Sequence, residues 1–452
     1  MQPSSSATPR DAGARSRIRL AAIALVFAAL TYRLFHLTGL YSVNIFFWDQ
    51  WDFNNATLFQ HHSLWEIFRW QHGPHRQGLG GLLSAWIDPL TSWNSRTESF
   101  IAAGLLVTAA LLALWLKYRL FGRLVWTDVL IPALMLSPTQ WESVWTTANL
   151  TLAMFPLLIM AYCLLWVWNN RRLKYGLIVL LNFGAIYTGF AFFLGLLTPA
   201  LLLGAWRQER SRGRQIYLRI CLALSVISVG SFFAGWRNES ASGCPSDLVP
   251  AGTYLQFASV LFASAFGIPY IPPYIGLLAI AAGGVVLIFL TAIAVAGWRR
   301  VLGGAETTAS SLVLSILSLY ILIFAAASAA GRACIGPEAA QSSRYGLYLN
   351  MSVICLYFAA LNRRPWRRIE PAFLVAVLAL PALVLLPFEE GTMIDFYNTK
   401  AAWRACYLSG KNFDECTGEA GDIYPSGAAK SDQLPEKLDL LKRTHRNLFA
   451  DR

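Results

Sequence analysis

The stretch that decides the fold is residues 273–298, PYIGLLAIAAGGVVLIFLTAIAVAGW, which carries no charged side chain. At about 1.5 Å per residue, a helix of this length crosses the ~30 Å of hydrocarbon in a lipid bilayer. Arg299 and Arg300 follow directly, and basic residues beside an apolar run are typical of the cytoplasmic end of a membrane span. The stretch therefore predicts a transmembrane helix.

Similar apolar runs recur from Leu20 almost to Leu386, and hydrophobic residues make up 56% of the 452-residue chain. Charged residues make up only 14%, against about 25% in soluble domains, which excludes a soluble enzyme. The strands of a membrane β-barrel would alternate apolar with polar residues, and these runs do not. We therefore predict an all-α polytopic membrane protein with eleven spans, near residues 20–40, 99–116, 124–138, 150–168, 174–187, 189–206, 216–235, 273–298, 309–330, 345–361 and 371–387.

The distribution of basic residues predicts the orientation. With the N-terminus in the cytoplasm, twenty-one Lys and Arg residues fall in inner segments and six in outer loops, as the positive-inside rule expects. Counting 253–267 as a span would place the later basic loops, including Arg299 and Arg300, on the outer side. We therefore expect this segment on the outer surface or half-inserted. Residues 1–19 are then a cytoplasmic N-terminus, 20–387 a membrane domain and 388–452 an extracytoplasmic tail. The net charge of +12 follows from these basic loops and does not indicate nucleic acid.

The predicted first outer loop, residues 41–98, is too long to be a simple connector. It holds four of the six histidines and six of the 17 tryptophans. Apolar residues near its end recur at helical spacing and predict an interfacial helix that lies flat on the bilayer. These residues are Leu79, Leu82, Leu83, Trp86 and Leu90.

The loop begins with Phe47-Trp48-Asp49-Gln50-Trp51-Asp52-Phe53. If this stretch is helical, Asp49 and Asp52 share one face. A carboxylate between tryptophans at a membrane edge is partly desolvated, which raises its pKa toward the range of a general base. The alternative is that the acids only hydrate a loop whose tryptophans form an interfacial belt.

A second motif, His72-Gly73-Pro74-His75-Arg76, is expected where the flat helix begins, because proline suits a first helical turn. Free N–H groups at the helix start, with Arg76 and the two imidazoles, would bind phosphate. The spacing of His72 and His75 also allows a divalent metal, with Asp49 as a further ligand. The simplest alternative is the polar side of an interfacial helix.

Two shorter motifs lie at other predicted outer ends. Ser342-Ser343-Arg344-Tyr345 precedes the tenth span, and Gln140-Trp141-Glu142 lies between the third and fourth. An arginine at a membrane edge must pair with an anion, snorkel or contact lipid headgroups. Together the four motifs place acids, arginines, histidines and aromatic residues on the outer face. That set suits a reaction between a lipid-borne phosphate ester and a second substrate.

These motifs resemble those of the GT-C class of membrane glycosyltransferases, and in particular a group of bacterial members. The sequences of that group carry motifs similar to Asp-x-Trp-Asp after the first span, followed by His-Asn-Glu-His-Arg, Gln-Trp-Glu-Asn, Gly-Arg-Ala and Ser-Arg-Tyr. The corresponding residues here are Asp49–Asp52, His72–Arg76, Gln140–Ser143, Gly331–Ala333 and Ser343–Tyr345. Gly73-Pro74 replaces Asn-Glu, which removes an acid, and Ser143 replaces Asn.

The resemblance implies transfer of a sugar, with inversion, from a polyprenyl-phosphate donor to a glycan or glycolipid acceptor on the outer face of the bacterial cytoplasmic membrane. Asp49 would be the general base and Asp52 would orient the acceptor, with Glu142 in reserve. The donor phosphate would leave with charge stabilised by Arg76 and Arg344. His72, His75, Tyr345 and Trp51 would complete the substrate contacts. No cofactor is expected, and a divalent metal is left open.

Two other classes fit the composition. A transporter or flippase for a lipid-linked sugar would place charges at mid-membrane and often shows repeated, broken helices; no repeat is visible. A non-catalytic envelope assembly partner is the third class, but it gives no reason to gather acids, histidines and arginines on one face. The enzyme is the favoured reading.

Cysteine positions agree with the predicted topology. Cys163, Cys221 and Cys355 fall in spans, whereas Cys244, Cys334, Cys406 and Cys416 fall on the outer side. An oxidising compartment permits a Cys406–Cys416 bridge that closes a short loop of the tail, and the alternative is four unpaired outer thiols. We expect the tail to fold back over the outer end of the bundle.

Overall fold

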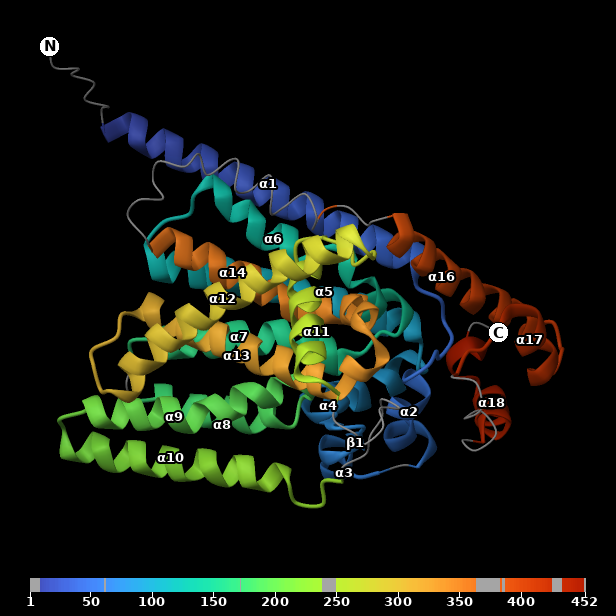
Figure 1. Cartoon of the computed structure of the whole chain (residues 1–452). Coiled ribbons are helices and arrows are strands. Elements are labelled where there is room, and N and C mark those ends of the chain that lie inside the picture. Colours follow the sequence, from blue (N-terminus) through green and yellow to red (C-terminus); the bar gives the residue numbers. More distant parts are fainter. Residues whose placement is uncertain are drawn as a thin grey trace, which may run out of the picture.

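The computed structural model describes residues 9–60, 62–170, 172–237, 249–362, 383, 387–424 and 433–450. This part is almost entirely helical, and its β structure is one two-stranded sheet. Eight helical segments within it are long and apolar enough to cross a membrane, which confirms an all-α polytopic membrane protein (Figure 1). These segments are Arg17–Tyr41, Ser95–Phe121, Leu150–Val167, Gly189–Gln208, Arg212–Phe232, Tyr274–Leu302, Ala309–Ile335 and Ser343–Asn362.

The long helices are α1 (Pro9–Tyr41), α5 (Ser95–Phe121), α7 (Leu150–Val167), α9 (Phe192–Gln208), α10 (Arg212–Phe232), α12 (Tyr274–Leu302), α13 (Ala309–Arg332), α14 (Gly346–Asn362) and α16 (Pro387–Leu408). The shorter α-helices and the two strands are α2 (Gln50–Asn54), α3 (Leu64–Arg69), β1 (Gln71–His72), β2 (His75–Arg76), α4 (Gly78–Ile87), α6 (Leu130–Met135), α8 (Lys174–Ile186), α11 (Ala251–Ser264), α17 (Phe413–Ala420) and α18 (Leu434–Arg443). Short 3₁₀ and π turns join them at η1 (Asn55–Phe59), η2 (Asp88–Thr91), η3 (Trp126–Val129), η4 (Pro138–Gln140), η5 (Glu142–Thr146), η6 (Gly189–Ala191), η7 (Ala333–Ile335), η8 (Pro337–Gln341), η9 (Ser343–Tyr345) and η11 (Asn447–Phe449).

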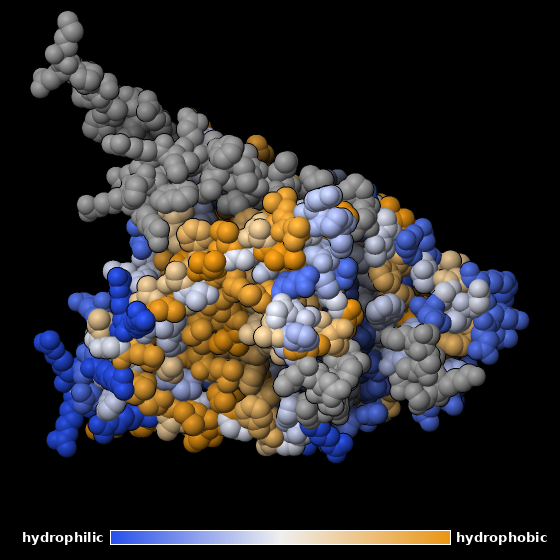
Figure 2. Space-filling model, viewed as in Figure 1, coloured by the Kyte–Doolittle hydropathy of each residue, from blue (hydrophilic) through white to orange (hydrophobic). Residues whose placement is uncertain are grey.

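On the face shown in Figure 2, apolar residues form a band across the middle of the bundle, and hydrophilic residues gather toward its two ends. Inside the band, the long helices pack around one apolar core. Asparagine side chains cap the N-termini of two of these helices, α5 and α7. Asn94 accepts a hydrogen bond from the backbone N–H of Arg96, and Asn149 accepts from those of Thr151 and Leu152. Such caps satisfy backbone donors that the first helical turn leaves free.

Three of the eleven expected spans are not long helices in the described residues. The segment expected at 124–138 forms η3 and α6, a stretch of ten residues from Trp126 to Met135, followed by the turn η4. Its residues from Leu130 to Pro138 are all buried. Broken backbone is tolerated at membrane depth when protein surrounds it, so apolar composition alone could not reveal the break. The segment at 174–187 is α8, with only 13 residues, and 371–387 lies almost wholly outside the described residues.

Residues 253–267 were expected on the outer surface or half-inserted. Most of this segment belongs to the 14-residue helix α11 (Ala251–Ser264), which is not among the candidate spans. Its side chains from Phe257 to Ala263 are buried against α12 and α13.

The interfacial helix expected near the end of the first loop is α4, continued by η2. Gly80 allows α4 to cross α7 closely, because a Cβ there would lie only 2.3 Å from backbone and side-chain atoms of Thr151. Trp86 and Leu90 on the other side are 70% and 75% exposed. The stripe is therefore helical as predicted, with its outer residues free to contact lipid.

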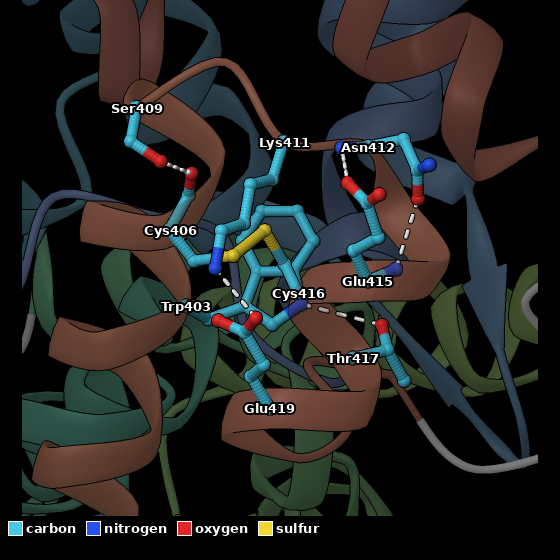
Figure 3. The surroundings of a disulfide bond; sticks show 9 residues. All are labelled: Trp403, Cys406, Ser409, Lys411, Asn412, Glu415, Cys416, Thr417 and Glu419. Carbon is cyan, nitrogen blue, oxygen red and sulfur yellow. Dashed lines mark hydrogen bonds and ion pairs between the residues drawn. A yellow bond between two sulfur atoms is a disulfide. The ribbon is translucent and has the colours of Figure 1, made fainter.

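The tail and the first loop share a second apolar core at one end of the bundle (Figure 1). Phe46, Phe47 and Trp51 from the loop pack there with Trp403 and Leu438 from the tail. The sulfurs of Cys406 and Cys416 form the expected disulfide, which joins α16 to α17 beside the Trp403 ring (Figure 3). The tail therefore folds back over the loop, as expected.

Candidate functional site

The two loop aspartates lie at the start of α2. Asp49 is the residue before the helix and Asp52 is in its first turn. Phe47 and Trp51 are buried in the core beneath, so the aspartates occupy the opposite side, with side chains 38% and 20% exposed. The expectation that both acids share one face is confirmed.

His72 lies between the two aspartates. Its Nε2 is 3.9 Å from Asp49 Oδ1 and its Nδ1 is 3.8 Å from Asp52 Oδ2. The histidine motif forms a tight β-hairpin in which β1 and β2 pair His72 with His75. Gly73 occupies the turn with φ of +54°, a conformation that favours glycine. The expected helix start at this motif is therefore wrong, because α4 begins only at Gly78, and the hairpin holds His72 against the aspartates instead.

Arg344 joins Asp49 to Glu142. Its Nη2 is 2.5 Å from Glu142 Oε1 and its Nη1 is 3.9 Å from Asp49 Oδ2. The other Glu142 oxygen accepts hydrogen bonds from the Ser342 hydroxyl and the Arg344 N–H, at 2.9 and 3.3 Å. Glu142 is thus committed to holding the Ser342–Arg344 turn, whereas the Asp49 side chain accepts no hydrogen bond within the described residues.

The tail contributes Tyr424 to the cluster. Its hydroxyl lies 3.1 Å from both carboxylate oxygens of Asp52, and the neighbouring Ile423 carbonyl accepts a hydrogen bond from the Trp48 N–H at 2.8 Å. Tyr424 was not predicted as a site residue, because 372 residues separate it from Asp52. Asp52 is therefore held from two sides, by the hairpin and by the tail.

A second cation lies beside Arg344. The Arg332 guanidinium, at the end of α13, is 5.9 Å from the ring centre of Tyr345. Within the described residues, no carboxylate pairs with Arg332, and the Arg344 Nε and the Tyr348 hydroxyl are buried without a hydrogen-bond partner. Unsatisfied buried donors are costly, so this corner is suited to an anion. In the sequence analysis Arg332 appeared only as part of the Gly331–Ala333 motif, and no role was predicted for it.

His75, expected to contact substrate, lies 4.0 Å from the Phe190 ring, centre to centre. Burial lowers the pKa of its imidazole to about 3, and the nearby positive charges of His72 and Arg332 act in the same direction. His75 is therefore neutral at physiological pH and does not add positive charge for binding phosphate.

Two predicted site residues are not brought to the cluster. Arg76 is 3% exposed, and its guanidinium donates to the carbonyls of Arg69, Phe232 and Ala234. It fastens the hairpin to the end of α10, so the phosphate contact expected of it does not fit this arrangement. Trp51 is fully buried, packed against Phe46 and stacked on Phe59.

Among the described residues, no group of three or more His, Cys, Asp or Glu side chains is arranged to hold a metal ion. The site consists of three carboxylates, Asp49, Asp52 and Glu142, which face the imidazole of His72, the guanidinium of Arg344 and, at the edge, that of Arg332. Such an arrangement can accept a proton on one side and neutralise an anion on the other.

Comparison of the chain with protein-family models, with curated proteins and with solved structures finds no match in any of the three.

Proposed function

We propose that this protein is a GT-C-like membrane glycosyltransferase, which moves a sugar from a polyprenyl-phosphate donor to a cell-envelope glycan or glycolipid on the outer face of the cytoplasmic membrane. One observation carries the proposal: the loosely held carboxylate of Asp49 lies 3.9 Å both from His72 and from Arg344. Glycosyl transfer with inversion needs a base for the acceptor hydroxyl and a cation for the departing phosphate, close to one another.

Asp49 is the proposed general base. It is the most exposed of the three acids, with 38% of its side chain accessible against 20% for Asp52 and 13% for Glu142. Its carboxylate also accepts no hydrogen bond within the described residues, so the carboxylate lone pairs can reach an acceptor hydroxyl. His72, which lies between the two aspartates, positions Asp49.

Asp52 and Glu142 have positioning roles in this proposal. Tyr424 and His72 hold Asp52, which suits a residue that orients the acceptor. Glu142 fixes the guanidinium of Arg344, so it is less suited to act as the base. Because both residues are engaged in this way, Asp49 is the better candidate for proton transfer.

The donor phosphate would bind at Arg344 and Arg332. A planar guanidinium can grip two phosphate oxygens, and the free Nε of Arg344 offers a further donor. As the sugar–phosphate bond breaks, negative charge grows on the leaving oxygen, and the two cations stabilise it. Asp49 takes the proton from the acceptor hydroxyl as the new glycosidic bond forms and later releases it to water, while the phosphate departs beside the two arginines; the two charge changes are thus separated within one site.

The proposed topology places this site outside the cell. Gln50 contacts both Glu98, in the first turn of α5, and the carbonyl of Ala148, just before α7, so the starts of these helices share one end of the bundle. The chain therefore returns to that end between α5 and α7 through the broken α6 segment. With the eleven spans expected from the sequence, the N-terminus is then in the cytoplasm and the tail outside.

A transporter gains no specific support. Asp128, the acid in the broken segment, lies 2.7 Å from Lys117 Nζ and accepts a hydrogen bond from the Tyr357 hydroxyl. Asp128 is therefore neutralised by a neighbouring lysine, which accounts for its burial without an ion pathway.

Comparing surface polysaccharides and glycolipids of a deletion strain with those of its parent, by mass, tests the proposal. Loss of one hexose, pentose or deoxysugar residue from a defined product, restored by the wild-type gene, is the expected result. Identical glycan and glycolipid masses in the two strains would contradict it.

A further inference from the structure

A wide apolar groove lies on the side of the bundle, outside the acid–cation cluster. Its volume is about 980 Å³, at the upper end of the ~300–1,000 Å³ typical of small-molecule sites. The walls come from α5, α7 and α8, and α3 and α4 close one end. The helix α8 has only 13 residues, and the loop helices α3 and α4 line the groove at the outer end.

The groove carries a single charged residue, and that residue lies at the end away from α3 and α4. Seventeen of its eighteen lining residues are apolar, aromatic or glycine, and the eighteenth is Arg119, in the last turn of α5. Trp168, directly after α7, lines the same end. A long apolar space with one cation and one tryptophan at its mouth matches a lipid, whose chains are apolar and whose headgroup begins with a phosphate.

The charge of Arg119 is not neutralised within the described residues, because no carboxylate pairs with it. The nearest basic neighbour along the helix, Lys117, is paired with Asp128 at 2.7 Å. The mouth of the groove therefore keeps a net positive charge at the end of the bundle where the proposed topology places the cytoplasm. Basic pockets between membrane helices on the cytoplasmic side favour anionic lipid headgroups.

We propose that this groove is a binding site for one anionic glycerophospholipid of the inner leaflet, with its phosphate at Arg119 and its acyl chains running toward Trp65 and Phe68. This lipid is not the sugar donor, so the inference is independent of the catalytic proposal. Trp65 and Phe68 lie in α3, directly before the hairpin that carries His72. The bound lipid therefore also supports the helices that hold this hairpin.

Native mass spectrometry of the delipidated full-length protein tests the site, with dioleoyl-phosphatidylglycerol and dioleoyl-phosphatidylcholine as probes that share the same chains. We expect phosphatidylglycerol to bind more tightly. Arg119→Ala should weaken its binding about five-fold, the effect of one basic residue at a membrane surface. Arg172→Ala is the matched control, because Arg172 is exposed and does not line the groove; it should leave binding unchanged.

Groove-filling variants test the location independently of charge. Ala161→Phe, and separately Leu164→Trp, place a ring in the groove from α7 and should weaken binding of both lipids. Two variants are used so that a folding defect in one does not decide the test. The proposal would be overturned by equal affinity for the two lipids or by equal effects of Arg119→Ala and Arg172→Ala. Unchanged binding in both filled variants would also overturn it, as would displacement of phosphatidylglycerol by equimolar polyprenyl phosphate.

Discussion

Replacing Asn447 with alanine should release the end of the tail from the first loop. Asn447 is fully buried, and its side chain joins three chain segments. Its Oδ1 accepts from the Phe46 N–H at 3.2 Å, and its Nδ2 donates to the Trp93 carbonyl at 2.7 Å and to the Ser95 hydroxyl at 2.9 Å. Its backbone φ of +50° is tolerated by asparagine better than by other non-glycine residues.

The expected loss is about 4 kcal/mol. Each of the three hydrogen bonds contributes about 1 kcal/mol net, and alanine in the left-handed conformation costs roughly 1 kcal/mol more. A local opening free energy lower by this amount raises the open population about a thousand-fold, since about 1.4 kcal/mol corresponds to a factor of ten.

Hydrogen exchange of residues 433–450 measures this opening directly. Asn398→Ala is the matched control, because Asn398 lies exposed on α16; it should leave exchange in that segment unchanged. Exchange within three-fold of wild type in Asn447→Ala would refute the conclusion that this side chain holds the tail in place.

The remaining predictions concern the buried lysine, the cation of the site and the topology. Burial lowers the pKa of Lys400 to about 7, below its value near 10.4 in the unfolded chain. Between pH 7 and 10 the unfolded state therefore binds more protons than the folded state. The free energy of unfolding should rise over this range by up to about 1.4 kcal/mol per pH unit. Thermal unfolding should show this rise in wild type and not in Lys400→Met, and parallel curves would contradict it. Arg344→Lys keeps the charge but loses the planar fork, so turnover should fall at least ten-fold while the melting temperature stays near wild type. Arg76→Lys should leave turnover near wild type but lower the melting temperature, because Arg76 holds backbone carbonyls. Unchanged turnover in Arg344→Lys, or an unchanged melting temperature in Arg76→Lys, would contradict the role assigned to that arginine. An impermeant thiol reagent should label Ser63→Cys in intact cells and Ser211→Cys only after permeabilisation, and the opposite pattern would reverse the proposed orientation.

Sequence predicted the long helices well because a continuous apolar run directly reflects the lipid around it. It failed where protein replaces lipid. The segment at 124–138 is as apolar as a span, yet its buried position allows short turns around Pro132 and Pro138. Composition does not distinguish these two apolar environments.

The acid–cation cluster was partly predictable for a similar reason. Asp49, Asp52, Glu142 and Arg344 were expected together because each follows or precedes an apolar run on the same side. The sequence could not tell which side of the hairpin each residue of the histidine motif faces, so Arg76 was assigned to phosphate although it binds carbonyls.

The contribution of the tail depends on distant contacts. Tyr424 reaches Asp52 only because the disulfide, the shared apolar core and Asn447 bring the tail back to the first loop. No periodicity near Tyr424 records these contacts, so only the three-dimensional arrangement assigns it to the site.

The most direct test of the central claim is the product formed when Asp49→Asn replaces the wild-type gene. Asparagine is nearly isosteric but does not accept a proton at neutral pH, and loss of a positioned base typically lowers the rate by about 10²- to 10⁴-fold. Asp439→Asn, in the exposed part of α18, is the matched control. We predict that the sugar-modified glycan or glycolipid disappears from the Asp49→Asn strain, with normal protein levels, and persists in the control. Wild-type amounts of the product in the Asp49→Asn strain would contradict the assignment of Asp49 as the general base.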